Sequence, residues 1–175
     1  LQASSGLLFS STGTSTVNGV ISGAASVTQA GSGTVTLVAN NTYTGTTTVN
    51  AGSTLQVGNN TPTGTLGSGA VTNNGNLIFN NSGAVNLNNN ISGSGNLNKT
   101  GGGQLYVYGN LTYTGTTTIN GTWMTFQAGS SLSGTSQVID NSCIQFKWNT
   151  QATFAVNISG GGQVWQSGSV NLTLT

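Results

Sequence analysis

One long segment of this chain occurs twice, in nearly the same form. Asn40–Asn50 reads NNTYTGTTTVN, and Asn110–Asn120 reads NLTYTGTTTIN. A longer block, Leu7–Gly23, realigns with Leu77–Gly93 at the same offset and with Ile144–Gly160 after a slightly shorter interval. A unit that recurs along a chain usually stacks on itself. The recurrence therefore predicts an elongated solenoid rather than a globule built around one central cavity.

The repeat divides the chain into a partial unit (1–38), a full unit (39–108) and a partial to full unit (109–175), which together form a single solenoid domain. Each unit holds about nine short strand-like pieces, so three strands per turn of a triangular coil give three rungs of roughly 23 residues. The whole chain then forms about seven to eight rungs. At ~4.8 Å per rung, the rod is expected to be roughly 36 Å long.

Apolar and polar residues alternate along short stretches, which is typical of strands with one buried face. The alternating stretches include Thr34–Leu37, Leu55–Val57, Asn76–Phe79, Leu105–Val107 and Val170–Leu174. Clusters of Gly, Asn and Ser separate them and supply the backbone freedom that tight corners need. The predicted fold class is all-β, a parallel β-helix (β-solenoid) with inward columns of apolar side chains. A β-sandwich also has short strands, but it does not explain why the long segment returns.

Composition limits the chemistry that this chain can perform. It has no His, Glu or Arg, and its charged side chains are Asp140, Lys99 and Lys147. One carboxylate cannot supply the pair that glycoside hydrolysis needs, a zinc site needs three or four ligands, and a serine triad needs a base. Two lysines are too few to neutralise nucleic-acid phosphates. We therefore expect no enzyme activity, no metal or cofactor and no nucleic-acid partner.

Other sequence features bear on location and on redox chemistry. The longest apolar runs are three or four residues, far short of the ~20 that a spanning helix needs, so we expect no membrane insertion of this segment. No signal peptide is visible at Leu1, so the sequence is either a mature chain or a part of a longer one. Cys143 is the only cysteine, and it is either a small buried hydrophobe or the site of an intermolecular bridge.

The stretch Gly31–Gly58 reads GSGTVTLVANNTYTGTTTVNAGSTLQVG. It resembles the passenger-associated repeat of bacterial autotransporters, in which a Gly-framed strand is followed by N-T-Y-T-G, by T-T-V-N-x-G and by a further L-x-V strand. The pattern returns in a less regular form at Gly101–Phe126. This resemblance implies a right-handed parallel β-helix exposed outside a bacterial cell, at the cell surface or in the extracellular medium. It implies no catalytic residue.

All three tryptophans, Trp123, Trp148 and Trp165, fall in the last third of the chain. The alternation of apolar and polar residues predicts that all three indole side chains point outward from the rod. An exposed tryptophan cluster on a polar rod is a candidate contact surface, and both carbohydrate stacking and subunit packing are compatible with it. The alternative is that a loop or a neighbouring chain covers these rings.

Strand-like segments lie close to both ends of the chain, and neither end carries a recognisable cap. The candidate end-stacking residues are Leu7, Leu8 and Phe9 near one end and Val170, Leu172 and Leu174 near the other. Uncapped strands with almost no charge favour head-to-tail pairing of identical chains, which propagates when the contact does not close.

The sequence leaves three functions open. The first is a non-enzymatic, extracellular β-solenoid subunit of a bacterial surface fibre that assembles by end-to-end stacking. The second is a passenger fragment of an autotransporter adhesin that binds a glycan or a host or matrix protein. A distant third is ice binding, which threonine-rich stretches such as Thr46–Thr48 suggest.

Overall fold

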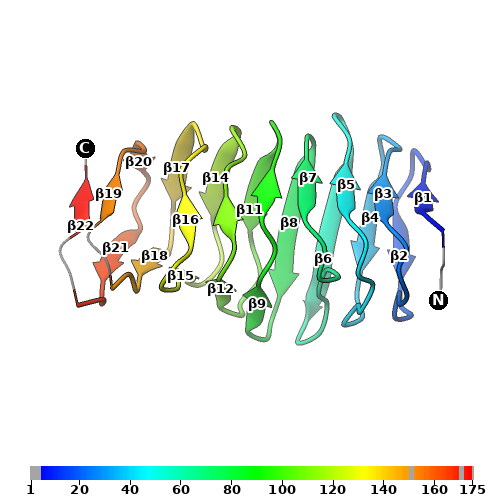
Figure 1. The fold of residues 1–175 in the computed structure, drawn as a ribbon, viewed down its shortest axis with the longest axis horizontal. Helices are drawn as coiled ribbons and strands as arrows, with labels where there is room; N and C mark the ends of the chain where they lie inside the picture. The colour runs from blue at the N-terminus through cyan, green and yellow to red at the C-terminus, as the bar shows by residue number, and fades with distance from the viewer. Residues whose placement is uncertain (1–4, 150–151, 170–171, 175) are drawn as a thin grey trace.

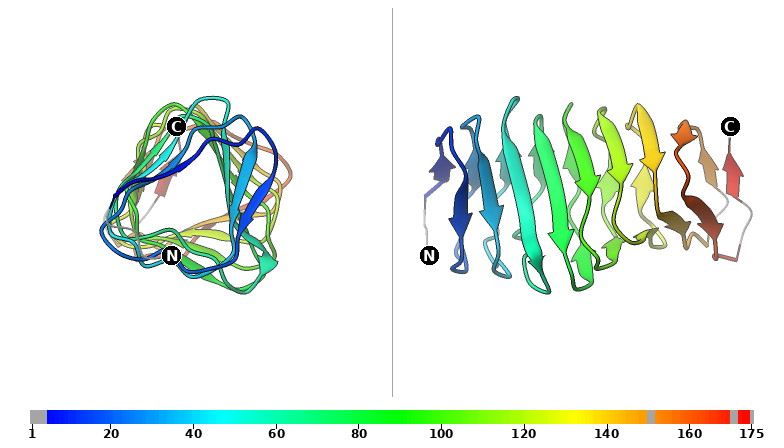
Figure 2. Two further views of the ribbon diagram at one scale, coloured as in Figure 1. Left: turned by 90° about the vertical axis from the view of Figure 1, so that its right-hand side faces the viewer. Right: turned by 180° about the vertical axis from the view of Figure 1, so that it is seen from behind.

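The computed structural model describes residues 5–149, 152–169 and 172–174, and its regular structure there consists of strands alone. The strands pair in parallel and form a solenoid of about eight turns. The chain winds from one end of a rod to the other (Figure 1), and the rod has a roughly triangular cross-section when viewed along its axis (Figure 2). The prediction of an all-β parallel β-helix with seven to eight rungs is confirmed.

Three sheets form the sides of the rod. The first sheet contains β1 (Leu7–Phe9), β3 (Val27–Gln29), β5 (Thr47–Val49), β7 (Val71–Asn73), β10 (Ile91–Ser92), β13 (Asn110–Leu111) and β16 (Ser131–Leu132). The second contains β2 (Ser15–Val17), β4 (Thr34–Leu37), β6 (Thr54–Thr61), β8 (Asn76–Asn81), β11 (Asn96–Lys99), β14 (Thr116–Ile119), β17 (Gln137–Asp140) and β20 (Ile158–Ser159). The third contains β9 (Val85–Leu87), β12 (Leu105–Val107), β15 (Met124–Phe126), β18 (Cys143–Phe146) and β21 (Gln163–Gln166). A two-stranded sheet of β19 (Ala152–Phe154) and β22 (Leu172–Leu174) lies at the C-terminal end.

The turns of the solenoid are shorter than the sequence predicted. Leu7 pairs with Val27 and Val27 pairs with Thr47, so these two turns have the same length. The next turn is longer, because Thr47 pairs with Val71. The expected rung of about 23 residues is therefore too long for most of the rod. Its strands are only two to four residues long at most positions, and the glycine-rich corners between them are tight.

The short turn changes how the sequence repeat lies on the rod. Three turns carry the chain from Leu7 only to Val71, so Leu77, the equivalent of Leu7, lies about a third of a turn further on. The equivalent residues Leu7, Leu77 and Ile144 lie in β1, β8 and β18, which belong to the first, second and third sheets. Each copy of the repeat is thus rotated about the rod axis by one face relative to the copy before it. The prediction of three turns per unit was wrong, because one unit spans about three and a third turns.

Inward side chains of neighbouring turns stack in columns along the axis. In the second sheet Val35 pairs with Leu55, Leu55 with Leu77 and Leu77 with Leu97, and each of these side chains is almost fully buried. Burying an aliphatic side chain of this size contributes about 1.5–3 kcal/mol. The columns therefore supply the continuity of the core that the repeat predicted.

The tyrosine of the TYTG segment is buried at a corner in each copy. Tyr43 is fully buried, and its hydroxyl lies 2.6 Å from Oγ1 of Thr47. Gly67 of the next turn lies so close to Tyr43 that an added Cβ would be 2.1 Å from the tyrosine carbonyl oxygen and 2.4 Å from a ring carbon. Tyr113 makes the same hydrogen bond to Thr117 and is also fully buried. The tyrosine of the repeat is therefore a packing residue in both copies.

Candidate functional site

Two of the three tryptophans meet on the outer surface of the third sheet. Trp123 directly precedes β15, and Trp165 lies in β21. Their ring centroids are 5.2 Å apart and their planes are tilted by 52°. Trp165 is 47% exposed, whereas Trp123 is half-buried. Tilted aromatic pairs at this spacing are favourable, so the two indoles support each other's positions.

A chain of hydrogen-bonded polar side chains runs beside this pair from turn to turn. The Tyr106 hydroxyl donates to Oε1 of Gln104 at 2.7 Å, and the Gln104 amide donates to Oγ1 of Thr125 at 2.8 Å. The Thr125 hydroxyl donates to Oε1 of Gln145 at 3.1 Å, and the Gln145 amide donates to the hydroxyl of Ser167 at 3.0 Å. These bonds fix the amide groups on the outer face.

A shallow cavity of about 380 Å³ lies over these residues, lined by Gln104, Tyr106, Thr122, Trp123, Gln145 and Lys147. We call Tyr106, Trp123 and Trp165, together with Gln104, Gln145 and Lys147, the aromatic patch. It combines an apolar ring surface with fixed amide donors and acceptors and one cationic side chain. Such a surface can stack against a flat apolar group while bonding to its hydroxyls.

Trp148 does not belong to this patch, and its predicted exposure is wrong. It is 7% exposed and packs against Phe146 and Phe154, with centroid distances of 4.6 and 6.4 Å. Its position has the same parity as the inward residues Ile144 and Phe146, so continued alternation directs it into the rod. Asn81, the equivalent residue of the preceding copy, is also buried.

The aromatic patch contains three members that the sequence alone did not single out. Tyr106, Gln104 and Gln145 are half-buried or buried, and they lie next to the tryptophans because successive turns place them in register. Tyr106 pairs with Thr125, Thr125 with Gln145 and Gln145 with Trp165. With a turn of about 20 residues instead of 23, the sequence would have predicted that these residues share one outward-facing column.

Lys99 is buried at the end of β11 and supports a corner. Its ammonium group donates a hydrogen bond to the carbonyl oxygen of Gly101. Gln29, the equivalent residue in the preceding copy, donates from its amide to the carbonyl oxygens of Gly31 at 3.0 Å and Gly33 at 2.8 Å. Burial lowers the pKa of Lys99 to about 8. The lysine therefore replaces a structural glutamine.

Asp140 lies two turns beyond Lys99 in the same column of the second sheet, because Lys99 pairs with Ile119 and Ile119 with Asp140. Its carboxylate accepts hydrogen bonds from the backbone N–H groups of Ser142 at 3.0 Å and Ile144 at 3.2 Å. Burial raises the pKa of Asp140, and these two bonds oppose the rise. Asp140 therefore fixes the corner between β17 and β18.

Cys143 follows at the start of β18 and is 3% exposed. Burial raises the pKa of its thiol, as does the nearby charge of Asp140. Its burial agrees with the expectation of a small core residue rather than a bridging thiol.

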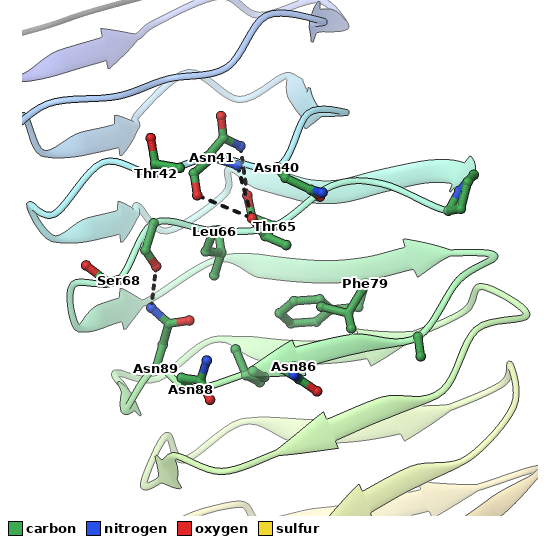
Figure 3. Close-up of a pocket in the computed structure, with 15 residues that line it drawn as sticks. Asn40, Asn41, Thr42, Thr65, Leu66, Ser68, Phe79, Asn86, Asn88 and Asn89 are labelled. Atoms are coloured by element: carbon green, nitrogen blue, oxygen red, sulfur yellow. Dashed lines mark hydrogen bonds between the residues drawn. The ribbon is translucent and has the colours of Figure 1, made fainter.

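A second cavity lies beside β9, where the third sheet begins, and nothing in the sequence analysis anticipated it. Its volume is about 560 Å³, and its walls are Asn40–Thr42, Thr65–Ser68 and Ala84–Asn89, with Pro62 and Phe79 at its edges. Figure 3 shows Leu66 and Phe79 among the amide side chains that surround the opening. We call this cavity the Asn cleft.

The Asn cleft lies beside a detour of the chain. β6 continues past the corner to Thr61, where it pairs with Asn81 after an irregularity in register. The chain then returns through Gly64, whose φ of +113° favours glycine, and Asn60 has a φ of +56°. This detour lengthens the turn. The glycines and asparagines of the detour, together with Pro62, are the sequence signal that could have located it.

The candidate end-stacking residues are placed only in part. Leu7, Leu8 and Phe9 form β1, which pairs with β3; Leu8 is 64% exposed, and the other two are half-buried against the core. Val170 lies outside the described residues. Leu172 and Leu174 belong to β22, which pairs with β19.

Two properties of the structure bear on chemistry and on membranes. Within residues 5–149, 152–169 and 172–174, no group of three or more His, Cys, Asp or Glu side chains could hold a metal ion. In the same part of the chain, no helix is long and apolar enough to cross a membrane.

The fold and its outer surface define a class of protein: a parallel β-solenoid with polar, nearly uncharged sides and one aromatic patch. Residues 27–57 and 97–121 match the family model described as passenger-associated-transport-repeat. The two matched stretches overlap those whose residues resembled this repeat, and the second is rotated by one face relative to the first. No curated protein and no solved structure matches the chain.

Proposed function

We propose that this chain is a rod-forming part of a bacterial surface protein and that its aromatic patch binds a glycan. The family match to passenger-associated repeats supports display at the cell surface. The observation that carries the binding proposal is the Trp123–Trp165 pair beside a cavity lined by fixed amide side chains. No other exposed tryptophan pair lies on the described residues.

The chemistry of the patch fits a sugar better than a charged or strongly apolar ligand. The exposed face of Trp165 can cover the apolar face of a pyranose ring, and the half-buried Gln104 can bond to its hydroxyls because its amide both donates and accepts. Lys147 adds one positive charge, which would accommodate a single sugar carboxylate. The hydrogen bonds among Tyr106, Gln104 and Gln145 through Thr125 hold these groups before a ligand arrives, which limits the entropy lost on binding.

A glycan array followed by calorimetry on the best hit tests this proposal. We expect Trp165→Ala to weaken binding by tenfold or more and Trp165→Phe to weaken it less, because a smaller ring still stacks. Leu8→Ala is the matched control, since Leu8 is an exposed apolar residue of the first sheet. An array without a hit, or a hit that Trp165→Ala binds as tightly as the wild type does, would exclude a glycan site here.

A second function is favoured by one observation, the strand edges of β1 and β2 at the N-terminal end of the described rod. Among the described strands β1 and β2 each pair on one side only, so their outer edges offer free backbone groups for a second rod. End-to-end stacking through these edges would produce a fibre. Negative-stain electron microscopy of the purified chain distinguishes the two functions. Thin filaments that Leu8→Lys abolishes and Trp165→Ala preserves support the fibre, and isolated short rods at all concentrations exclude it.

A further inference from the structure

The third sheet begins at β9, whereas the other two sheets continue past that turn toward the N-terminus. Across the same two turns, β6 pairs with β8 in the second sheet and β7 with β10 in the first. In the third sheet, β12 is the one described strand that pairs with β9. Thr65, in the turn before β9, forms an isolated bridge with Asn40 of the turn before that, and not with β9. The side of β9 that faces the preceding turn is therefore a free strand edge inside the rod.

The free edge presents backbone groups to the Asn cleft. The N–H of Val85 donates to the carbonyl oxygen of Gln104 at 2.9 Å, and that of Tyr108 donates to the carbonyl oxygen of Leu87 at 2.9 Å. Val85 and Leu87 thus direct their backbone groups toward β12. In a parallel pair the intervening residue directs its N–H and C=O the other way. The N–H and C=O of Asn86 therefore point toward the cleft. Leu66, on the opposite wall one turn earlier, forms no backbone bond to Asn86 in this described part of the chain.

Two buried asparagines flank this opening and satisfy the groups beside it. The Asn81 amide donates to the carbonyl oxygens of Thr63 at 2.8 Å and Gly64 at 3.0 Å. The Asn89 amide donates to the carbonyl oxygen of Gly67 at 2.8 Å (Figure 3) and to that of Gly69 at 2.6 Å. On either side of Leu66, hydrogen bonds from asparagine side chains thus take the place of backbone hydrogen bonds between the two turns. The cleft between them is a built feature of the turn.

We propose that the Asn cleft binds an extended, uncharged polypeptide segment, which adds a strand to the free edge of β9. A strand supplies alternating N–H and C=O groups that match those of Asn86. The lining of the cleft contains amide, hydroxyl and apolar side chains and none with a charge, so a charged segment would lose hydration without a partner. Leu66 and Val85, each 7% exposed, would contact a small apolar side chain at the centre of the segment.

The probe is a fluorescein-labelled pentapeptide, Thr-Val-Thr-Val-Thr with blocked ends, added to the intact chain. We expect saturable binding by anisotropy and at least tenfold slower hydrogen exchange of the Asn86 amide when the peptide is bound. In the free protein, this amide should exchange faster than the amide of Val85, which bonds to β12. The same peptide with every inner amide N-methylated should bind at least tenfold more weakly.

Two variants at one position separate the backbone contact from the side chain. Asn86→Pro removes the N–H that faces the cleft, and proline is tolerated on an edge strand where that N–H has no ladder partner. Asn86→Thr keeps the N–H. We expect the proline variant to lose the peptide by tenfold or more, and the threonine variant and Trp165→Ala to bind like the wild type.

Several results would overturn the proposal. They are no binding at millimolar peptide, equal binding of the N-methylated peptide, or an Asn86 amide that exchanges slowly in the free protein and does not respond to the peptide. The exchange measurement on the wild type decides the question if Asn86→Pro fails to fold. None of these results bears on glycan binding, because the aromatic patch is a separate set of residues.

Discussion

The hydroxyl of Tyr43 lies 2.6 Å from Oγ1 of Thr47, inside a corner where both side chains are fully buried. The same bond joins Tyr113 to Thr117 one unit later. Burial raises the pKa of both tyrosines, and the bond to threonine opposes the rise. Within the recurring segment, the tyrosine and the threonine four residues later are therefore the residues that close the corner.

Tyr43→Phe should lower the free energy of unfolding by about 1–2 kcal/mol, because Oγ1 of Thr47 would be buried without its partner. The double variant Tyr43→Phe with Thr47→Val should recover part of this loss, since it removes both polar groups. Urea denaturation followed by circular dichroism measures the effect. Tyr108→Phe serves as the control, because Tyr108 is 47% exposed and its change should cost little. Equal effects at the two positions would contradict the buried bond.

Gly67→Ala should destabilise the rod by about 1–3 kcal/mol or more, since the new methyl group would overlap the carbonyl oxygen and ring of Tyr43. Gly102→Ala is a matched control, because an added Cβ there meets no atom within 4 Å. Thermal denaturation of the two variants should give a clearly lower midpoint for Gly67→Ala alone. Identical midpoints would show that the corner can relax without cost.

Lys99 should make the stability of the rod depend on pH. Its pKa is lowered from an ordinary value of 10.5 to about 8, so between these values the unfolded chain binds more protons than the folded one. Stability should therefore rise as pH increases from about 8, and Lys99→Gln, which restores the residue type of position 29, should remove this rise.

The experiment on Lys99 compares the urea midpoints of wild type and variant at pH 7, 8 and 9. Cys143 and the buried tyrosines have raised pKa values and lower the stability as pH rises above about 9, so the difference between the two proteins is the quantity to follow. A difference that stays constant from pH 7 to 9 would mean that the Lys99 ammonium is well hydrated.

Trp148→Ala and Trp165→Ala should affect stability very differently. Trp148 packs among Phe126, Phe146 and Phe154, so its truncation should cost about 3–5 kcal/mol. Trp165 is half exposed, and its loss should cost about 1 kcal/mol or less. Denaturation of both variants in parallel tests the assignment of one indole to the core and the other to the surface. A reversed order would place the wrong tryptophan in the patch.

The architecture of the rod could be predicted because it depends on periodicity. The return of the long segment implied stacking, and alternation in stretches such as Thr34–Leu37 and Leu105–Val107 located strands that the structure contains. The length of one turn could not be read in the same way. The rod has three similar faces, so equivalent residues of the repeat can lie on the same face or on different faces. The length of the repeat unit is therefore compatible with three long turns or with a larger number of shorter turns.

The site was predicted less well than the fold, and for a related reason. Neighbours on the surface of a solenoid are separated by one turn, so a small error in the length of the turn moves every predicted neighbour to another column. Trp123 and Trp165 lie on the outer surface, as alternation indicated, but Tyr106 and Gln145 were not connected to them. The exposure of Trp148 was wrong because its parity is that of the inward residues of β18. The Asn cleft depends on a detour whose path no periodicity describes.

The rotation of equivalent residues from β1 to β8 to β18 has a consequence for how such rods diversify. Duplicating a unit of whole turns would copy a new surface residue along one straight stripe. Here each duplication moves that residue to the next face of the rod, and it returns to the original face only after three duplications. As such a rod lengthens by duplication, copies of one surface residue therefore come to lie on all three faces of the rod.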